Sequence, residues 1–180
     1  MKYLLANIDD YIEESFVKLE LTKEQRKRAK TKSTLVSYCL LDTLLKELQL
    51  KLTDIDYENG KPKIEGAYIS VTHKDKYVAC SIFSQPIGID LERIKDFDKN
   101  IMNYFFLKEE REYVLSKENQ KEAFFTLFTI KESIAKLKGL GIQNFLDFNI
   151  IKENKIEYCN TEIVIKKIDN DYLLSICYEK

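Results

Sequence analysis

Gly88-Ile89-Asp90-Leu91-Glu92 is the stretch that says most about how this chain folds. Its carboxylates alternate with aliphatic residues, which is the period-two pattern of a β-strand with one face in a core. On such a strand Asp90 and Glu92 point to the same side, and the aliphatic residues are buried on the other. The leading glycine lets another segment approach the backbone closely. The stretch therefore predicts a strand over 86–92 that holds a pair of carboxylates rigidly.

A second informative stretch is a predicted helix over 120–138, in which apolar residues recur at helical spacing. Glu132 and Lys136 interrupt the apolar pattern and lie one turn apart on one face. Taken alone, they fit an ordinary ion pair on a helix surface. If this helix meets the strand that carries Asp90 and Glu92, three carboxylates and a lysine converge. Such a group suits a divalent cation that grips a phosphate-bearing ligand.

Composition excludes several classes of protein. The 180 residues fit one ordinary domain or two small ones, and a hydrophobic share of 44% is enough for a real core. The formal net charge of −1 gives no global field that attracts nucleic acid. No apolar run reaches membrane-spanning length, and the first residues do not resemble a signal peptide. The cysteines lack metal-binding spacing and are expected to be reduced core residues of a cytoplasmic protein. They are Cys39, Cys80, Cys159 and Cys177.

The remaining patterns predict an α+β protein made of two similar α/β halves packed about a pseudo-twofold axis. Ser84-Gln85-Pro86 is a turn signal, so we expect an N-terminal half over 1–85 and a C-terminal half over 86–180. Leu21–Arg26 resembles Phe106–Arg111, and each precedes a longer apolar helix. Further strands are predicted over 2–8, 67–72, 76–83, 146–151, 155–166 and 171–178, and further helices over 10–19, 22–30, 33–50 and 107–116.

A basic cluster offers a rival hypothesis for function. Residues 23–32 carry six basic side chains against one acid, Glu24. A solvated helix face is the ordinary interpretation, and a phosphate-binding patch is the alternative. A non-catalytic anion- or nucleic-acid-binding module built on this helix is therefore the competing reading, although no RNA-binding aromatic pattern accompanies the cluster.

Two more polar positions are candidates. His73 is the only histidine and follows Thr72 near the end of a predicted strand, where its ring could donate to a phosphate. A lone histidine is more often structural. Glu110 lies at the end of Phe105-Phe106-Leu107-Lys108-Glu109-Glu110, and by itself it predicts only an acid on a helix surface.

In their order, these motifs resemble those of the 4′-phosphopantetheinyl transferase superfamily, specifically the pseudo-dimeric type that activates surfactin synthetase. The family pattern is a Ser-His pair, Gly-(Ile/Val)-Asp-aliphatic-Glu, Phe-Phe-x-x-x-Glu and Trp-x-x-Lys-Glu-(Ser/Ala)-x-x-Lys. The matching pieces here are Thr72-His73, Gly88–Glu92, Phe105–Glu110 and Phe128–Lys136, with Gly60-Lys61-Pro62 resembling the family's turn before the histidine strand. The likeness covers residues 55–142 well. Thr72 replaces the usual serine, Phe128 replaces the tryptophan, and an arginine often found on the long first-half helix has no counterpart.

The resemblance implies the fold of that family and a Mg²⁺-dependent enzyme. It implies transfer of the 4′-phosphopantetheine group from coenzyme A to a serine of an apo acyl or peptidyl carrier protein, with release of 3′,5′-ADP. By that similarity, Asp90, Glu92 and Glu132 would bind Mg²⁺. Lys136 would pair with a phosphate and stabilise the transferring group, and Glu110 would be the general base.

The resemblance also implies contacts to the phosphates and nucleotide of coenzyme A from the first half. The residues concerned are Arg28, Lys61, Thr72 and His73. The carrier protein is expected to dock near residues 86–116, where exposed lysines would meet its acidic surface. A monomer is expected, without nucleic-acid or membrane partners.

Overall fold

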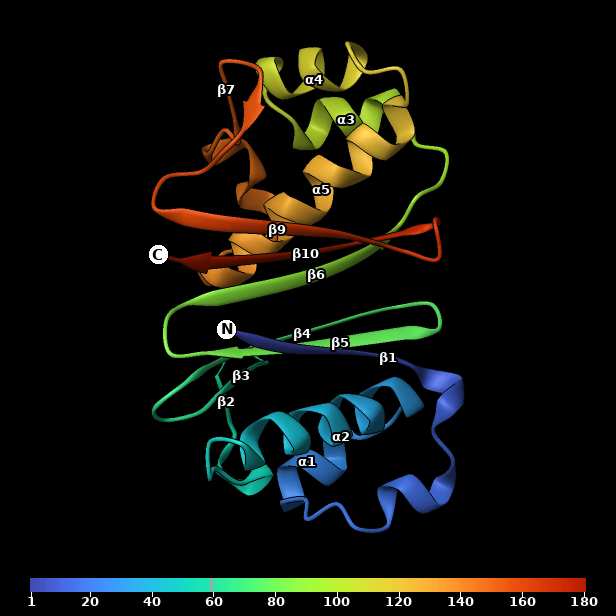
Figure 1. Ribbon diagram of the computed structural model, residues 1–180, viewed down its shortest axis with the longest axis vertical. Helices are drawn as coiled ribbons and strands as arrows, with labels where there is room; N and C mark the ends of the chain where they lie inside the picture. Colours follow the sequence, from blue (N-terminus) through green and yellow to red (C-terminus); the bar gives the residue numbers. More distant parts are fainter. Residues whose placement is uncertain (59) are drawn as a thin grey trace. The chain divides into compact units, whose positions relative to one another are not determined.

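The computed structural model describes residues 1–58 and 60–180, and it divides into two compact units, Met1–Gln85 and Pro86–Lys180. Each unit has its own hydrophobic cluster, and in each a long helix covers one face of a three-stranded antiparallel sheet (Figure 1). The predicted α+β class is therefore confirmed. The pseudo-twofold packing of the halves stays a prediction.

The first unit is built on a sheet in the order β1-β5-β4. Its elements are β1 Lys2–Asn7, α1 Lys23–Arg28, α2 Lys32–Lys46, β2 Asp56–Glu58, β3 Lys61–Lys63, β4 Tyr68–Lys74 and β5 Tyr77–Phe83. The Thr31 side chain accepts from the backbone N–H of Thr34 and so caps the start of α2. Leucines recur along the buried face of α2 and pack on β5 and β1.

The expected helix over 10–19 is wrong. The chain forms two 3₁₀ turns there, Ile8–Asp10 and Glu13–Phe16. The Asn7 side chain caps the first turn, and Ser15 Oγ accepts from the N–H of Ile12 at the start of the second. These local side-chain bonds compete with a continuous helix. Ile12 and Val17 also remain exposed, so no continuous apolar face supports a longer helix.

The second unit has the sheet order β6-β10-β9. Its elements are β6 Ile87–Arg93, α3 Lys99–Phe105, α4 Lys108–Leu115, α5 Gln120–Leu137, a 3₁₀ helix Ile142–Asp147, β7 Ile151–Lys152, β8 Lys155–Ile156, β9 Thr161–Ile168 and β10 Tyr172–Glu179. The strand expected over 146–151 is wrong for all but its last residue, because the 3₁₀ helix takes its first two residues and residues 148–150 form no regular structure. The strand expected over 155–166 is divided between β8 and β9. Helix α3 was not expected.

The two units share one connectivity. Each runs strand, long helix and hairpin, and the second hairpin strand takes the centre of the sheet. In the first unit Leu4 of β1 pairs with Cys80 of the central strand, and in the second Asp90 of β6 pairs with Ser175. Cys80 and Ser175 each lie three residues after the tyrosine that begins its strand. The predicted similarity of the two halves is thus present in their topology.

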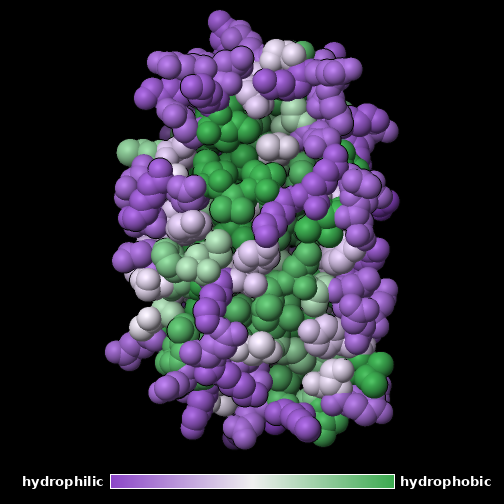
Figure 2. All heavy atoms as spheres, viewed as in Figure 1, coloured by the Kyte–Doolittle hydropathy of each residue, from purple (hydrophilic) through white to green (hydrophobic). Residues whose placement is uncertain are grey.

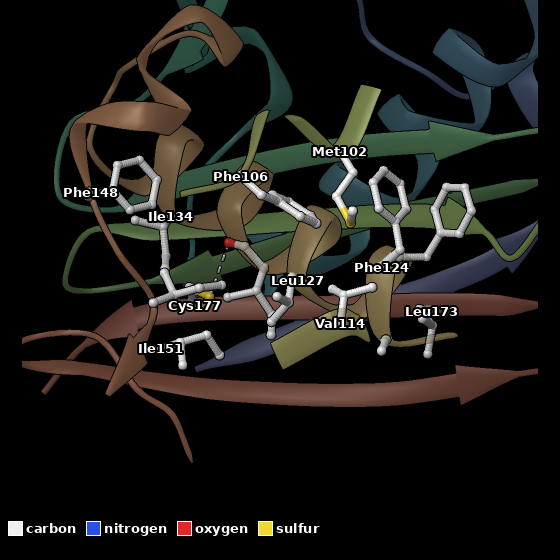
Figure 3. Packing of buried hydrophobic residues seen from close by; sticks show 14 residues of the cluster. Met102, Phe106, Val114, Phe124, Leu127, Ile134, Phe148, Ile151, Leu173 and Cys177 are labelled. Carbon is white, nitrogen blue, oxygen red and sulfur yellow. Dashed lines mark hydrogen bonds between the residues drawn. The ribbon is translucent and has the colours of Figure 1, made fainter. Parts of the chain in front are cut away.

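Aromatic side chains fill the core of the second unit. Phe106 and Phe124 lie 5.1 Å apart between ring centroids, and Phe124 stacks on Phe97 at 4.3 Å. Figure 3 shows Phe106 and Phe124 in this cluster, together with Met102, Leu127 and Leu173. Hydrophilic side chains cover the outer face of α4 (Figure 2). The aromatic core holds α5 against the sheet.

Two sequence expectations about surroundings can be compared with the structure. Within the described residues, no helix is long and apolar enough to cross a membrane. All four cysteines are free thiols, and Cys80 and Cys177 are buried as expected. Cys39 is only half-buried. Cys159 is exposed, contrary to expectation, because it lies in the turn that precedes β9.

At Gly88 the backbone of α5 lies very close to that of β6. A Cβ atom at this position would lie 1.8 Å from the carbonyl oxygen of Ser133 and 2.8 Å from the backbone nitrogen of Leu137. Both atoms belong to the α5 backbone, so no rotamer change relieves the overlap. Only glycine allows the helix to lie this close to the strand.

We expect Gly88→Ala to destabilise the protein by about 3 kcal/mol, the upper part of the range for overpacking, because α5 must move away from β6. Urea unfolding measures this change. Gly141→Ala is the matched control, since its Cβ would meet only the flexible end of the Gln143 side chain. It should stay within about 0.5 kcal/mol of the parent. Equal stabilities of the two variants would contradict the close approach.

Candidate functional site

Asp90 is the centre of the candidate site. It lies on the face of β6 that α5 covers and is 5% exposed. Its Oδ1 accepts from Nζ of Lys136 at 2.8 Å, and its Oδ2 accepts from Oγ1 of Thr129 at 3.0 Å. Lys136 Nζ also donates to the carbonyl oxygen of Ile89 at 2.9 Å. The structure therefore joins the acid of the strand motif to the lysine of the helix motif.

Glu92 and Glu132 lie on the same two elements. Glu92 follows Asp90 by two residues, so it points to the same face of β6, and it is half-buried. Glu132 lies one turn before Lys136 on α5 and is also half-buried. Because α5 packs on β6, the elements that carry the three predicted metal ligands are in contact.

The carboxylates do not form a finished metal site. Among the described residues, no three acidic, histidine or cysteine side chains are grouped so that they could hold a metal ion as they stand. The donor set nevertheless fits Mg²⁺ chemically, because hard divalent cations prefer carboxylate oxygens. The ammonium of Lys136 at Oδ1 of Asp90 also shows that the fold accepts positive charge at this oxygen.

Three hydroxyl groups, of Thr129, Ser133 and Ser175, continue from Asp90 beneath α5, and we call them the hydroxyl seam. Ser175 Oγ donates to the carbonyl oxygen of Thr129 at 2.6 Å and lies 3.3 Å from its hydroxyl. Ser133 Oγ donates to the carbonyl oxygen of Ser175 at 3.1 Å and also contacts its hydroxyl. All three residues are fully buried. Sequence reasoning missed the seam, although its two helix members are polar residues one turn apart on an otherwise apolar face.

The first unit provides an internal reference for this site. Cys80 Sγ donates to the carbonyl oxygen of Ser37 on α2 at 3.6 Å, just as Ser175 Oγ donates to that of Thr129 on α5. The two central-strand residues are equivalent, so Ser37 is the counterpart of Thr129. This contact aligns the two long helices residue by residue.

The alignment shows that the positions in the first unit that correspond to the charged residues around Asp90 are occupied by apolar residues. The counterparts of Glu132, Ser133 and Lys136 are Leu40, Leu41 and Leu44, and by strand register those of Asp90 and Glu92 are Leu4 and Ala6. The three α2 leucines are at most 5% exposed. Buried charges rarely stabilise more than well-packed apolar residues of similar volume. The shared fold therefore does not require the polar groups of the second unit, which points to a functional role.

Glu110 is not the helix-surface acid that its local sequence predicted. Its side chain is fully buried, and both oxygens accept from Nζ of Lys131, at 2.8 and 2.7 Å. Oε1 also accepts from the N–H of Ile150 at 3.0 Å and Oε2 from that of Leu107 at 2.9 Å. Burial lowers the pKa of Lys131, and pairing with Glu110 raises that pKa part of the way back. A carboxylate held in this way is poorly placed to take a proton from a substrate.

Gln25 occupies the corresponding place in the first unit. Its Oε1 accepts from the N–H of Thr22 at 2.8 Å, and its Nε2 donates to the carbonyl oxygen of Leu52 at 2.7 Å. In both units the third residue of the short helix, α1 or α4, thus hydrogen-bonds to the start of its own helix and to the segment that follows the long helix, α2 or α5. Because an uncharged glutamine does this in one unit, the arrangement favours a structural role for Glu110.

Two candidate residues of the first unit, Arg28 on α1 and Lys61 on β3, are connected through β2. The Arg28 guanidinium lies 4.1 Å from the ring centroid of Tyr57, and its Nε donates to Glu24 at 2.8 Å. Tyr57 belongs to β2, which pairs with the strand that carries Lys61. Arg28 therefore already contacts Tyr57 and Glu24. It is the last residue of α1, so the basic helix is shorter than the 23–32 segment on which the rival hypothesis was built.

Thr72 and His73 do not share a face of the sheet. Val71 packs into the core of the first unit, so Thr72 points to the opposite face, where it is 6% exposed. His73 returns to the first face at the exposed end of β4. The contacts to coenzyme A phosphates that the resemblance implies for Thr72 and His73 stay a prediction.

We expect Glu110→Ala to destabilise the protein by about 3–5 kcal/mol, because it leaves Lys131 as a buried, unpaired charge. The loss should also depend on pH. Without Glu110 the pKa of Lys131 falls further below its ordinary value of 10.5. Between the two values the unfolded chain binds more protons than the folded one, so the stability of the variant rises with pH. Urea unfolding at neutral and at alkaline pH measures both effects.

The control combines Glu110→Gln with Lys131→Met, which copies the uncharged arrangement of Gln25. This double variant should recover to within about 1.5 kcal/mol of the parent, since the charges are removed together and the volumes are kept. A single Glu110→Ala variant as stable as the parent would show that the ion pair does not hold the unit together.

Comparisons with known proteins agree with the order of these motifs. Residues 86–177, which are 92 of the 180 residues, match the model of the 4′-phosphopantetheinyl transferase superfamily. The 4′-phosphopantetheinyl transferase gsp of Aneurinibacillus migulanus is 34% identical over 137 residues, 64% of this chain and 58% of its own length. The transferase Sfp of Bacillus subtilis (strain 168) is 31% identical over 149 residues, 73% of this chain and 66% of its own.

A shorter relative matches as well. The holo-[acyl-carrier-protein] synthase of Chlamydia caviae is 36% identical over 92 residues, 48% of this chain and 75% of its own length. For the two longer relatives, gsp and Sfp, the part that matches this chain is less than two thirds of their own length. Since the family model covers just over half of the sequence, and covers the unit in which Asp90 and Lys136 meet, the chain belongs to the 4′-phosphopantetheinyl transferase superfamily.

Proposed function

We propose that this protein transfers the 4′-phosphopantetheine group of coenzyme A to a serine of an apo acyl or peptidyl carrier protein. The observation that carries this proposal is the set of charged groups around Asp90 in the second unit. At the equivalent strand positions the first unit has leucine and alanine. The names of the relatives supply the reaction class, and that of the shorter relative supplies the carrier protein.

In the proposed reaction the serine oxygen attacks the β-phosphorus of coenzyme A. A serine O–P bond forms, the phosphoanhydride P–O bond breaks, 3′,5′-ADP leaves and the hydroxyl proton is released. Asp90, Glu92 and Glu132 would hold Mg²⁺, which when bound neutralises charge on the pyrophosphate. Each of these residues comes from one of two packed elements, β6 and α5.

Lys136 would bind the transferring phosphate. Its side chain is 30% exposed, and its ammonium already lies 2.8 Å from Oδ1 of Asp90. A phosphate oxygen would compete with this carboxylate for the ammonium and leave Oδ1 of Asp90 to the cation. Placed in this way, Lys136 stabilises negative charge that develops on the transferring group.

The remaining contacts of the proposal come from both units. Arg28, Lys61, Thr72 and His73 would contact coenzyme A, with Thr72 and His73 acting on different atoms because they point to opposite faces of β4. Exposed lysines in 86–116 would meet the acidic surface of the carrier protein; they are Lys95, Lys99 and Lys108. The proposal is for a cytoplasmic, monomeric enzyme.

The test is Mg²⁺-dependent incorporation of phosphopantetheine into an apo carrier protein. Asp90→Asn and Lys136→Ala should each lower the rate by about 10² or more, because each removes charge that stabilises the transferring group. Glu118→Gln is the control, since it removes an exposed acid of the same unit and should leave the rate unchanged. Undiminished transfer by Asp90→Asn would overturn the assigned site.

The role of Glu110 has its own test. The Glu110→Gln/Lys131→Met variant should transfer within about threefold of the parent if Glu110 is structural, because a lost general base typically costs 10²–10⁴. Rates are compared under conditions in which both proteins are fully folded. A loss of that larger size in the folded double variant would restore the base role to Glu110.

A further inference from the structure

The hydroxyl seam meets the candidate site at a single carboxylate oxygen. An ionised carboxylate only accepts hydrogen bonds, so Thr129 must be the donor to Oδ2 of Asp90. A hydroxyl has one proton, and this assignment uses the proton of Thr129. The direction of the bond is therefore fixed by chemistry and does not depend on an assumed hydrogen position.

The other two hydroxyls of the seam bond to backbone carbonyl groups and link Thr129 to β10. Ser175 Oγ donates to the carbonyl oxygen of Thr129, and Ser133 Oγ in turn donates to the carbonyl oxygen of Ser175. All three side chains are fully buried, so solvent does not compete for these bonds. Threonine is also restricted at χ1 within a helix, which limits the positions its hydroxyl can take.

We propose that Thr129 is a positioning residue for Asp90. By holding Oδ2 against α5, it presents Oδ1 toward Lys136 and toward the cation and phosphate that the site would receive. Ser175 and Ser133 are the support that keeps Thr129 in place. This inference rests on the proposed function and adds to it a residue that acts through Asp90 rather than on the substrate.

The first unit shows that the fold alone does not call for this contact. Ser37, the counterpart of Thr129, donates its hydroxyl to the carbonyl oxygen of Ser33 in its own helix. The strand residue opposite is Leu4, which offers no acceptor in its side chain. The contact between Thr129 and Asp90 is therefore not repeated between Ser37 and Leu4, the equivalent pair of the first unit.

The experiment compares Thr129→Val, which keeps the shape and removes the hydroxyl, with Thr129→Ser, which keeps the hydroxyl. Mn²⁺ serves as a probe, and its dissociation constant is measured on the folded protein without carrier. We expect Thr129→Val to weaken Mn²⁺ binding and lower kcat by about 10–100-fold, the usual effect of losing a residue that orients a metal ligand. KM for the carrier should not change, and Thr129→Ser should restore both quantities to within about threefold.

Two further variants complete the design. Ser37→Ala deletes the equivalent hydroxyl of α2 and should leave Mn²⁺ affinity and kcat unchanged. Should Thr129→Val fail to fold, Ser175→Ala removes the hydroxyl that donates to the carbonyl oxygen of Thr129 and leaves the Thr129 side chain in place. A weaker affinity for Mn²⁺ in that variant supports the positioning role, and an unchanged affinity overturns it.

The possible failures are distinguishable. If Thr129→Val matches the parent while Asp90→Asn loses both Mn²⁺ binding and transfer, the positioning role is wrong and the proposed function stands. If the parent neither transfers the group nor binds Mn²⁺ in a way that depends on Asp90, the proposed function fails, and the positioning role fails with it. If Thr129→Ser is as impaired as Thr129→Val, shape rather than the hydroxyl is responsible.

Discussion

The close approach of α5 to β6 is the constraint on which the second unit depends. Gly88 permits it, because any side chain at that position would overlap the backbone of α5 at Ser133. The contact places Lys136 and Thr129 on either side of the Asp90 carboxylate, one at each oxygen. The aromatic core behind α5 holds the helix in this position. A single small residue on the strand thus decides whether an acid and a lysine 46 residues apart form one group.

The repeated fold separates what packing needs from what function needs. Both units place a long helix over a sheet with the same strand order, and in both a central-strand side chain donates to a carbonyl oxygen of that helix. In the first unit buried leucines of the helix surround this hydrogen bond, whereas at the equivalent place the second unit buries a carboxylate and three hydroxyls. Buried polar groups are tolerated only when their hydrogen bonds are satisfied, and the bonds among Thr129, Ser133 and Ser175 meet that requirement.

The comparison of units also changes the interpretation of Glu110. A motif glutamate beside a metal-type cluster invites a catalytic role, but its carboxylate is enclosed by Lys131 and two backbone N–H groups. Gln25 performs the same tie without charge in the first unit. The ion pair fixes α4 to α5 and to the segment before β7, so it supports the site indirectly by holding the helix that carries Glu132 and Lys136.

The sequence by itself determined the main strands, the two long helices, the α+β class and the family, because hydrophobic periodicity and ordered motifs are local properties of the chain. It also determined that Asp90 and Glu92 share a face, since side chains alternate strictly along a strand. It did not determine the 3₁₀ turns near residue 12, where side-chain bonds to the backbone replaced a helix. Only the tertiary structure decided that Glu110 is buried and that Ser175 lies beneath Thr129. These facts depend on which elements pack together, and packing joins residues far apart in the chain through contacts that no local pattern specifies.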